Sequence, residues 1–244
     1  MGFIAGVPHF FALSGRAVGV FFIAFLILIA CRRPSLAVEA VGMLTPEVIG
    51  GLEVAREADR LVVALGAGGA GVVLFAFEKS GGVWEERLAV NGFAGRSGIA
   101  RAKREGDGIT PAGVYSFGEI FGTAEDPGSI KHYRKLLSGD IWVDDPDSKY
   151  YNRPAREDFR GKDWRSAENL SAEDVAYKYA IAINYNANPV ARGIGSAIFL
   201  HCSKGGPTDG CVAVPEREMV ELLKFIDDST LIAIADSLAA LLEY

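Results

Sequence analysis

Residues Phe199–Pro215 read FLHCSKGGPTDGCVAVP, an apolar strand-like start, a run of turn-forming residues and a second apolar stretch. Within this segment, His201 stands ten residues before Cys211, which directly follows Gly210. The connection Lys204–Gly210 consists of residues that favour turns, so it lets the chain double back and bring the thiol beside the imidazole. An imidazole and a thiol held this close are the minimum that a cysteine nucleophile requires.

The same segment supplies the surroundings that a reactive thiol needs. A free cysteine has a pKa of about 8.5, so a neighbouring imidazole or oriented N–H groups must raise its thiolate fraction at pH 7. The apolar run Ser196–Leu200 is predicted to be a buried strand that ends at His201 and gives the imidazole a rigid base. Gly210 has no Cβ, so the backbone there can direct its N–H groups at a substrate as an oxyanion hole requires. We therefore predict Cys211 as a nucleophile and His201 as its base.

Three other interpretations of these residues stay open. A lone cysteine or histidine is often an ordinary buried residue. His201, Cys202, Asp209 and Cys211 could instead bind zinc, although their spacing matches no zinc-finger pattern. A disulfide between Cys202 and Cys211 in an oxidising compartment would block the nucleophile.

Two separated motifs carry a family resemblance. The sequence TDGCV, Thr208–Val212, follows His201, and EGDGITPAGVY, Glu105–Tyr115, lies upstream. In this order they resemble the active-site motif and the Gly-Asp-x-x-Thr-Pro-x-Gly-x-Tyr segment of the YkuD-type L,D-transpeptidases. The chain differs from the usual family pattern in a shorter connection between histidine and cysteine, and in Ala213, where an Arg or Asn is common.

The resemblance implies a set of catalytic roles. Cys211 would be the nucleophile, His201 the base and acid, the backbone carbonyl of Cys202 would orient His201, and the N–H of Gly210 would bind the oxyanion. The reaction would be acyl transfer on peptidoglycan stem peptides, which cross-links or remodels the cell wall. The alternatives are an L,D-carboxypeptidase that hydrolyses the same bond, or a catalytically silent wall-binding module. The resemblance implies no metal ion and no other cofactor.

Substrate contacts are expected on both sides of the nucleophile. Thr208 and Asp209 lie in the turn before it. The long polar and aromatic stretch Phe121–Leu170 is predicted to be an inserted loop or lid, because connections of that length in a compact domain tend to be functional. Within it, Tyr151 and Arg153 are candidates for holding a peptide carboxylate, since an arginine can form a bidentate pair with it. The alternative is that Arg153 only solvates the surface.

Apolar runs bounded by glycines predict the strands of the domain. Residues 61–69 and 71–82 favour a hairpin, and further strands are predicted within 84–93, 114–118, 179–186 and 230–235. The strand within 179–186 is expected to pair with Ser196–Leu200. One helix is predicted near residues 219–226, where four apolar side chains share a face. Several strands, few helices and long connections indicate a mainly β domain, and the resemblance implies a β-sandwich-like fold.

The N-terminal region is predicted to be a leader. Arg16 precedes fourteen apolar residues, 17–30, which suit a signal-peptide core better than a membrane span of about twenty residues. Leu28–Cys31 fits the lipobox pattern, in which the cysteine is lipidated; the alternatives are cleavage further on or an uncleaved anchor over residues 10–31. The expected domains are a signal peptide or anchor at 1–31, a linker at 32–59 and a catalytic domain at 60–244.

Composition agrees with an exported enzyme. The 244 residues, half of them hydrophobic, can bury one substantial core. A formal net charge of −6 argues against binding to nucleic acid, which would require a basic face. We expect an extracytoplasmic protein of the periplasm or cell envelope, with peptidoglycan stem peptides as partners and membrane contact only through the N-terminal segment.

Overall fold

The computed structural model describes residue 42 and residues 44–244. The strands in this part are β1 Arg60–Gly66, β2 Gly71–Ser80, β3 Val83–Phe93, β4 Ile99–Ala100, β5 Thr110–Pro111, β6 Gly113–Gly122, β7 Tyr133–Lys135, β8 Asp140–Val143, β9 Arg153–Arg156, β10 Ala167–Asn169, β11 Ala180–Ile183, β12 Phe199–Cys202, β13 Val212–Val214 and β14 Leu231–Ala235. The helices are α2 Pro46–Gly51, α3 Glu216–Phe225 and α4 Leu238–Leu241, with 3-10 turns η1 Val54–Arg56, η2 Leu170–Ala172 and η3 Ala176–Lys178.

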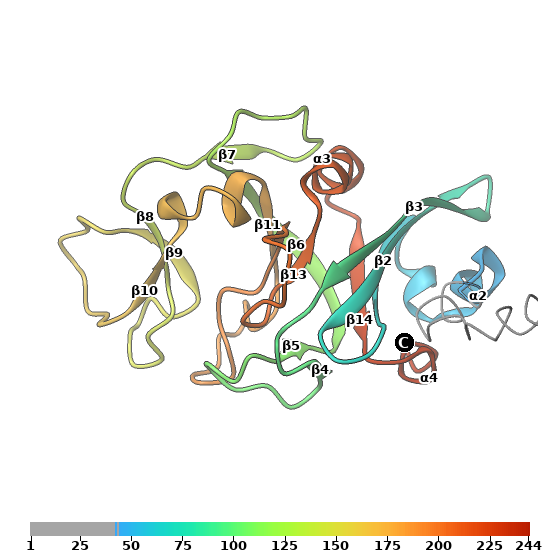
Figure 1. Cartoon of the computed structure of the whole chain (residues 1–244), viewed down its shortest axis with the longest axis horizontal. Helices are drawn as coiled ribbons and strands as arrows, with labels where there is room; N and C mark the ends of the chain where they lie inside the picture. Colours follow the sequence, from blue (N-terminus) through green and yellow to red (C-terminus); the bar gives the residue numbers. More distant parts are fainter. Residues whose placement is uncertain (1–41, 43) are drawn as a thin grey trace, which may run out of the picture. The chain divides into compact units, whose positions relative to one another are not determined.

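One large sheet dominates these residues and confirms the predicted mainly β class. Its nine strands follow the order β11-β12-β13-β3-β2-β1-β14-β6-β7, and β11 also pairs with β6. That additional pairing closes the sheet on itself in a barrel-like way (Figure 1). Most of its strand pairs are antiparallel, but the pairs β1–β14, β12–β13 and β6–β7 are parallel.

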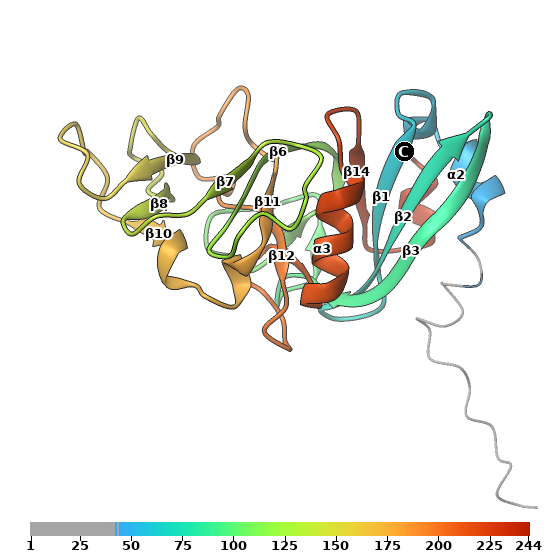
Figure 2. The same ribbon diagram turned by 90° about the horizontal axis from the view of Figure 1, so that it is seen from above.

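The predicted local elements are present. β1 and β2 form the expected antiparallel hairpin, and β3 continues it. β11 pairs with β12 as expected, with Ala180 opposite His201. The predicted helix is α3, which buries Met219, Leu222 and Leu223. Figure 2 shows α3 lying beside β12 and β14, where these side chains join the main core.

Within the expected linker, the described residues 44–58 pack against the sheet. Thr45 caps α2 by accepting a hydrogen bond from the N–H of Val48. Leu44 and Ile49 are buried in a second core together with side chains of β1 and β2. The segment packs here because its apolar side chains cover the face of the β1–β2 hairpin that points away from the main core. Side chains of the hairpin alternate between its two faces, and both faces are buried.

The stretch expected to be an inserted loop contains a small sheet of its own. β8 pairs with β10 on one side and β9 on the other, at one end of the view in Figure 1. Ile141, Val143 and Trp164 form a separate apolar cluster inside it. The polar composition concealed these strands, since β9 and β10 are short and have no fully buried residue.

The predicted leader at residues 1–31, including Cys31, lies outside the described residues. Among residues 44–244, no helix is both long and apolar enough to span a membrane.

Candidate active site

The site lies where β12 and β13 run side by side. Leu200 pairs with Val212 and His201 with Ala213, so Cys211 stands next to Phe199 in this parallel register. Side chains alternate along a strand, so His201 and Phe199 share one face while Leu200 and Cys202 share the other. Cys211 packs in the apolar cluster that contains Phe199, whereas Cys202 packs in the main core with Leu200. The imidazole and the thiol therefore project to the same side of the sheet.

His201 and Cys211 line one cavity of about 310 Å³. Two of the predicted substrate residues, Thr208 and Asp209, also line it. The remaining wall is formed by Glu168, Glu173, Ala176, Tyr177, Ala197, Lys204, Gly206, Pro207 and Ala213. The cavity is thus both apolar and charged, with three carboxylates and one ammonium in the wall that also contains the nucleophile candidate.

His201 is held in a defined orientation. Its Nδ1 lies 2.8 Å from the carbonyl oxygen of Cys202, the contact that the family resemblance implies. Because a carbonyl only accepts, this contact places the proton on Nδ1 and leaves the Nε2 lone pair free to act as a base. The ring also packs edge-on against Tyr177, with 5.6 Å between centroids. Burial lowers the pKa of His201 to about 4, so the imidazole is neutral at pH 7.

The thiol of Cys211 is fixed by two backbone groups. The N–H of Phe199 donates to Sγ, and Sγ donates to the carbonyl oxygen of Ala197, both at 3.3 Å. Burial, and then the charge of Glu168, raise the pKa of Cys211 to about 12. The resting site therefore holds a neutral thiol beside a neutral imidazole, and the thiolate forms when the proton moves to the base.

Thr208 anchors the turn around the nucleophile. Its Oγ1 donates to the carbonyl oxygen of Cys211 at 2.7 Å and accepts from the N–H of Gly210 at 3.2 Å. Thr110, from the upstream motif, donates to the same Cys211 carbonyl at 3.2 Å and accepts from the N–H of Gly95 at 2.7 Å. The two motifs thus meet at one carbonyl group. Gly210 has a φ of 142°, a conformation that favours glycine.

Of the other three candidate residues, one lies at the cavity rim and two lie outside the cavity wall. Asp209 is exposed at the cavity rim, where it forms an ion pair with Arg96. Arg153 is exposed on β9 and does not contribute to the cavity wall. Tyr151 is buried and also outside the wall; its hydroxyl donates to Glu105 and accepts from the N–H of Gly195 at 3.1 Å.

Several site residues were not predicted from the sequence. Glu168, Glu173 and Lys204 are ordinary charged residues in sequence, and Glu173 and Lys204 form an ion pair at 2.8 Å at the cavity. Tyr177, whose hydroxyl donates to Glu168, belongs to η3. Glu168, Glu173 and Tyr177 lie outside both motifs, and Lys204 was interpreted from the sequence only as a turn residue, so only the packing in three dimensions reveals all four as site residues.

The zinc and disulfide interpretations find no support in the part of the chain that the structure describes. Cys202 and Cys211 are both free, and their side chains occupy clusters on opposite faces of the sheet. The Sγ of Cys202 instead donates to the carbonyl oxygen of Tyr179 at 3.6 Å. Residues 44–244 contain no group of three His, Cys, Asp or Glu side chains arranged to bind a metal ion.

Comparison with protein families agrees with the fold and the motifs. The model of the YkuD family, the L,D-transpeptidase catalytic domain, matches residues 62–234. The chain therefore belongs to the YkuD family of L,D-transpeptidase catalytic domains. Membership indicates L,D-transpeptidase-type activity on peptidoglycan. A search among curated proteins gives no match.

Proposed function

We propose that the protein is an L,D-transpeptidase in which Cys211 is the nucleophile and His201 the general base. The observation that carries this proposal is the placement of both side chains in one cavity, with the Nδ1 of His201 held by the Cys202 carbonyl. That contact leaves Nε2 as the proton acceptor, which is the arrangement that a cysteine–histidine pair needs.

The reaction has two halves. His201 takes the thiol proton, and the Cys211 sulfur attacks the carbonyl carbon between an L-centre and a terminal D-residue of a stem peptide, generally diaminopimelate and D-alanine. The C–N bond then breaks, and His201 returns the proton to the leaving amine, which leaves a thioester on Cys211. An amine of a second stem peptide resolves the thioester and forms a cross-link. Water in its place gives the L,D-carboxypeptidase reaction, our second candidate.

The oxyanion would be bound by backbone N–H groups next to the nucleophile. The N–H of Gly210 already donates to Thr208, so we assign the main role to the N–H of Cys211. The Gly210 N–H can assist only if it leaves Thr208 when substrate arrives. The resemblance implied that the N–H groups around Gly210 and Cys211 bind the oxyanion, and this proposal divides that role between them.

Incubation with purified muropeptides, with and without an amine acceptor, tests the proposal by product mass. Wild-type protein should release D-alanine and form cross-linked products. Cys211→Ala should lose turnover, whereas Cys202→Ala should retain it because its side chain lies on the opposite face of β12. Equal turnover by wild type and Cys211→Ala would contradict the mechanism. Release of D-alanine without cross-links would assign the carboxypeptidase activity.

We also propose that residues 1–31 export the domain to the periplasm or cell envelope. The support is the apolar run at 17–30 and the extracytoplasmic location of the substrate class. If Cys31 is lipidated, the Cys31→Ser substitution should move the protein from the membrane fraction to the soluble fraction. An unchanged distribution would argue against lipidation.

A further inference from the structure

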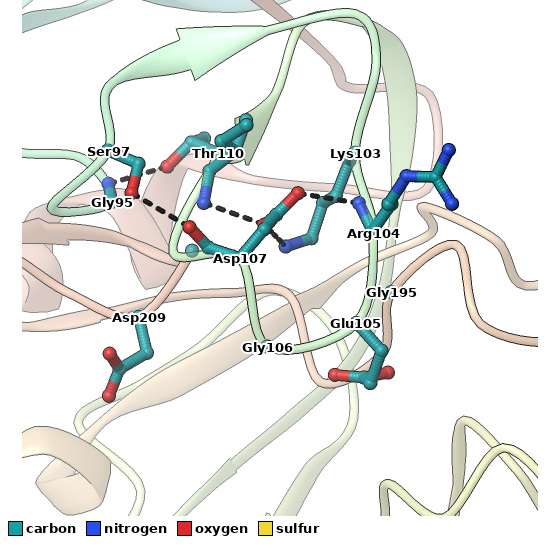
Figure 3. A network of polar contacts seen from close by, with 12 residues as sticks. Gly95, Ser97, Lys103, Arg104, Glu105, Gly106, Asp107, Thr110, Gly195 and Asp209 are labelled. Carbon is teal, nitrogen blue, oxygen red and sulfur yellow. Dashed lines mark hydrogen bonds and ion pairs between the residues drawn. The ribbon is translucent and has the colours of Figure 1, made fainter.

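A lysine is buried against Gly210, the residue that precedes the nucleophile candidate. The side chain of Lys103 is only 2% exposed, and its Nζ lies 3.0 Å from Oδ1 of Asp107, four residues on. Figure 3 shows the two side chains meeting where the chain enters the upstream motif, with Lys103 just before the motif and Asp107 within it. Fully buried lysines are rare because an ammonium is costly to remove from water, so this placement needs an explanation.

Two glycines close the slot that holds Lys103. A Cβ on Gly195 would lie 2.6 Å from Cε of Lys103, and a Cβ on Gly210 would lie 3.2 Å from Nζ. Any larger residue at these two positions would therefore press on the lysine. The ammonium group of Lys103 lies against Gly210, the residue that precedes Cys211 in the chain.

Asp107 is itself fixed as the partner of this ammonium. It accepts hydrogen bonds from the N–H groups of Arg104 at 2.6 Å and Ile109 at 2.9 Å. Burial alone would raise the pKa of Asp107, but these two N–H groups and Lys103 together hold it below its usual value. The ion pair is therefore anchored to the loop backbone, and Lys103 is not free to turn towards solvent.

We propose that Lys103 is a positioning residue of the active site, whose buried ammonium stabilises the thiolate of Cys211 across Gly210. The inference rests on the proposed role of Cys211 as nucleophile and deepens it. A positive charge within a few ångströms favours the ionised form of a thiol, and burial strengthens the effect because water screens it less.

The other charged groups around Cys211 act in a different way. Glu168 opposes ionisation of the thiol, while Lys103 favours it. The titratable and charged residues around the thiol are Lys103 from the loop, Tyr177 from η3, His201 from β12, and Glu168, Glu173, Lys204 and Asp209 from the cavity wall. Lys204 is exposed and paired with Glu173, and Asp209 is exposed and paired with Arg96. Lys103 is the cation of this set whose side chain is buried.

The proposal is tested by alkylating the full chain with iodoacetamide. The rate of alkylation of Cys211 is measured from pH 5 to 10. Mass spectrometry of the Cys211 peptide separates it from Cys202 and Cys31. Lys103→Met fills the slot without charge, and Lys103→Gln keeps a donor for Asp107. The scan lies below the pKa of Cys211, so the rate at each pH follows the small thiolate fraction. In both variants we expect this rate to fall about tenfold or more, including at pH 7, because loss of the ammonium raises the pKa of the thiol.

Lys131→Met is the matched control. Its ammonium is also largely buried and paired, with Asp228 at 2.7 Å, but it contacts the carbonyl oxygen of Phe117 rather than the site. It should leave the alkylation profile unchanged. An unshifted profile in a folded Lys103 variant would overturn the proposal, and so would loss of folding in both variants, which would assign Lys103 a structural role. A Lys103-dependent profile in a protein inactive on muropeptides would count against the proposed function alone.

Discussion

The Oδ1 atom of Asn152 accepts a hydrogen bond from the N–H of Ala197 at 3.0 Å. Ala197 has a φ of 51°, which is unfavourable for alanine, and its carbonyl oxygen accepts the hydrogen bond from the Cys211 thiol. Asn152 also accepts from the indole N–H of Trp142 and donates to the carbonyl oxygens of Tyr185 and Asn186. The insertion thus holds the backbone that positions the thiol.

Asn152→Ala should therefore lower kcat by about ten- to a hundredfold with a smaller change in KM, because the thiol loses its fixed position. Steady-state kinetics on a stem peptide would measure this. Asn152 itself has a φ of 56°, so part of the effect could be backbone strain. Asn152→Gly removes that strain and should lose comparable activity. A fully active glycine variant would show that the hydrogen bonds are dispensable.

His201 should make the stability of the protein depend on pH. Its pKa is about 4 in the folded state against about 6.5 when unfolded, so between these values the unfolded state binds more protons. His201 therefore contributes up to about 3 kcal/mol to the free energy of unfolding. This contribution is fully present above about pH 6.5 and is lost as the pH falls towards 4.

Urea unfolding at pH 7 and pH 4.5 would measure this contribution. His201→Gln lacks the titrating group, so its free energy of unfolding should fall less than that of the wild type over this interval. The carboxylates titrate in both proteins and cancel in the comparison. Parallel pH dependence in the two proteins would mean that His201 is not buried in its neutral form.

Thr110 should contribute to both stability and activity. It is fully buried, and its hydroxyl joins the Gly95 N–H to the Cys211 carbonyl. Thr110→Val leaves a buried donor without a partner, so we expect a loss of about 1–3 kcal/mol in the free energy of unfolding and a lower kcat.

Thr230→Val is the control for Thr110→Val. Thr230 is also fully buried, and its hydroxyl contacts Asp227 at 2.8 Å, away from the cavity wall. Its loss should cost similar stability but leave kcat unchanged. If both variants lowered kcat equally, the effect would follow from general destabilisation.

The sequence predicted the elements whose residues interact locally. The hairpin β1–β2 and the strands β11 and β14 appear as apolar runs, since a strand buried on both sides needs consecutive apolar residues. The small sheet of the insertion was not predicted, because Arg153–Arg156 and Ala167–Asn169 are polar and largely solvent-facing. The surface on which residues 44–58 pack could not be predicted, because a short apolar segment gives no sign of what it covers.

The sequence by itself determined the identities and order of the site motifs: His201, the turn, Gly210 and Cys211, with Thr110 upstream. Only the tertiary structure decided which neighbours these residues have. The parallel register of β12 and β13 separates Cys202 from Cys211, and long-range packing brings Lys103 against Gly210 and Asn152 against Ala197. Pairs so far apart in the chain meet only when the sheet closes, so the electrostatics of the thiol is a property of the folded domain.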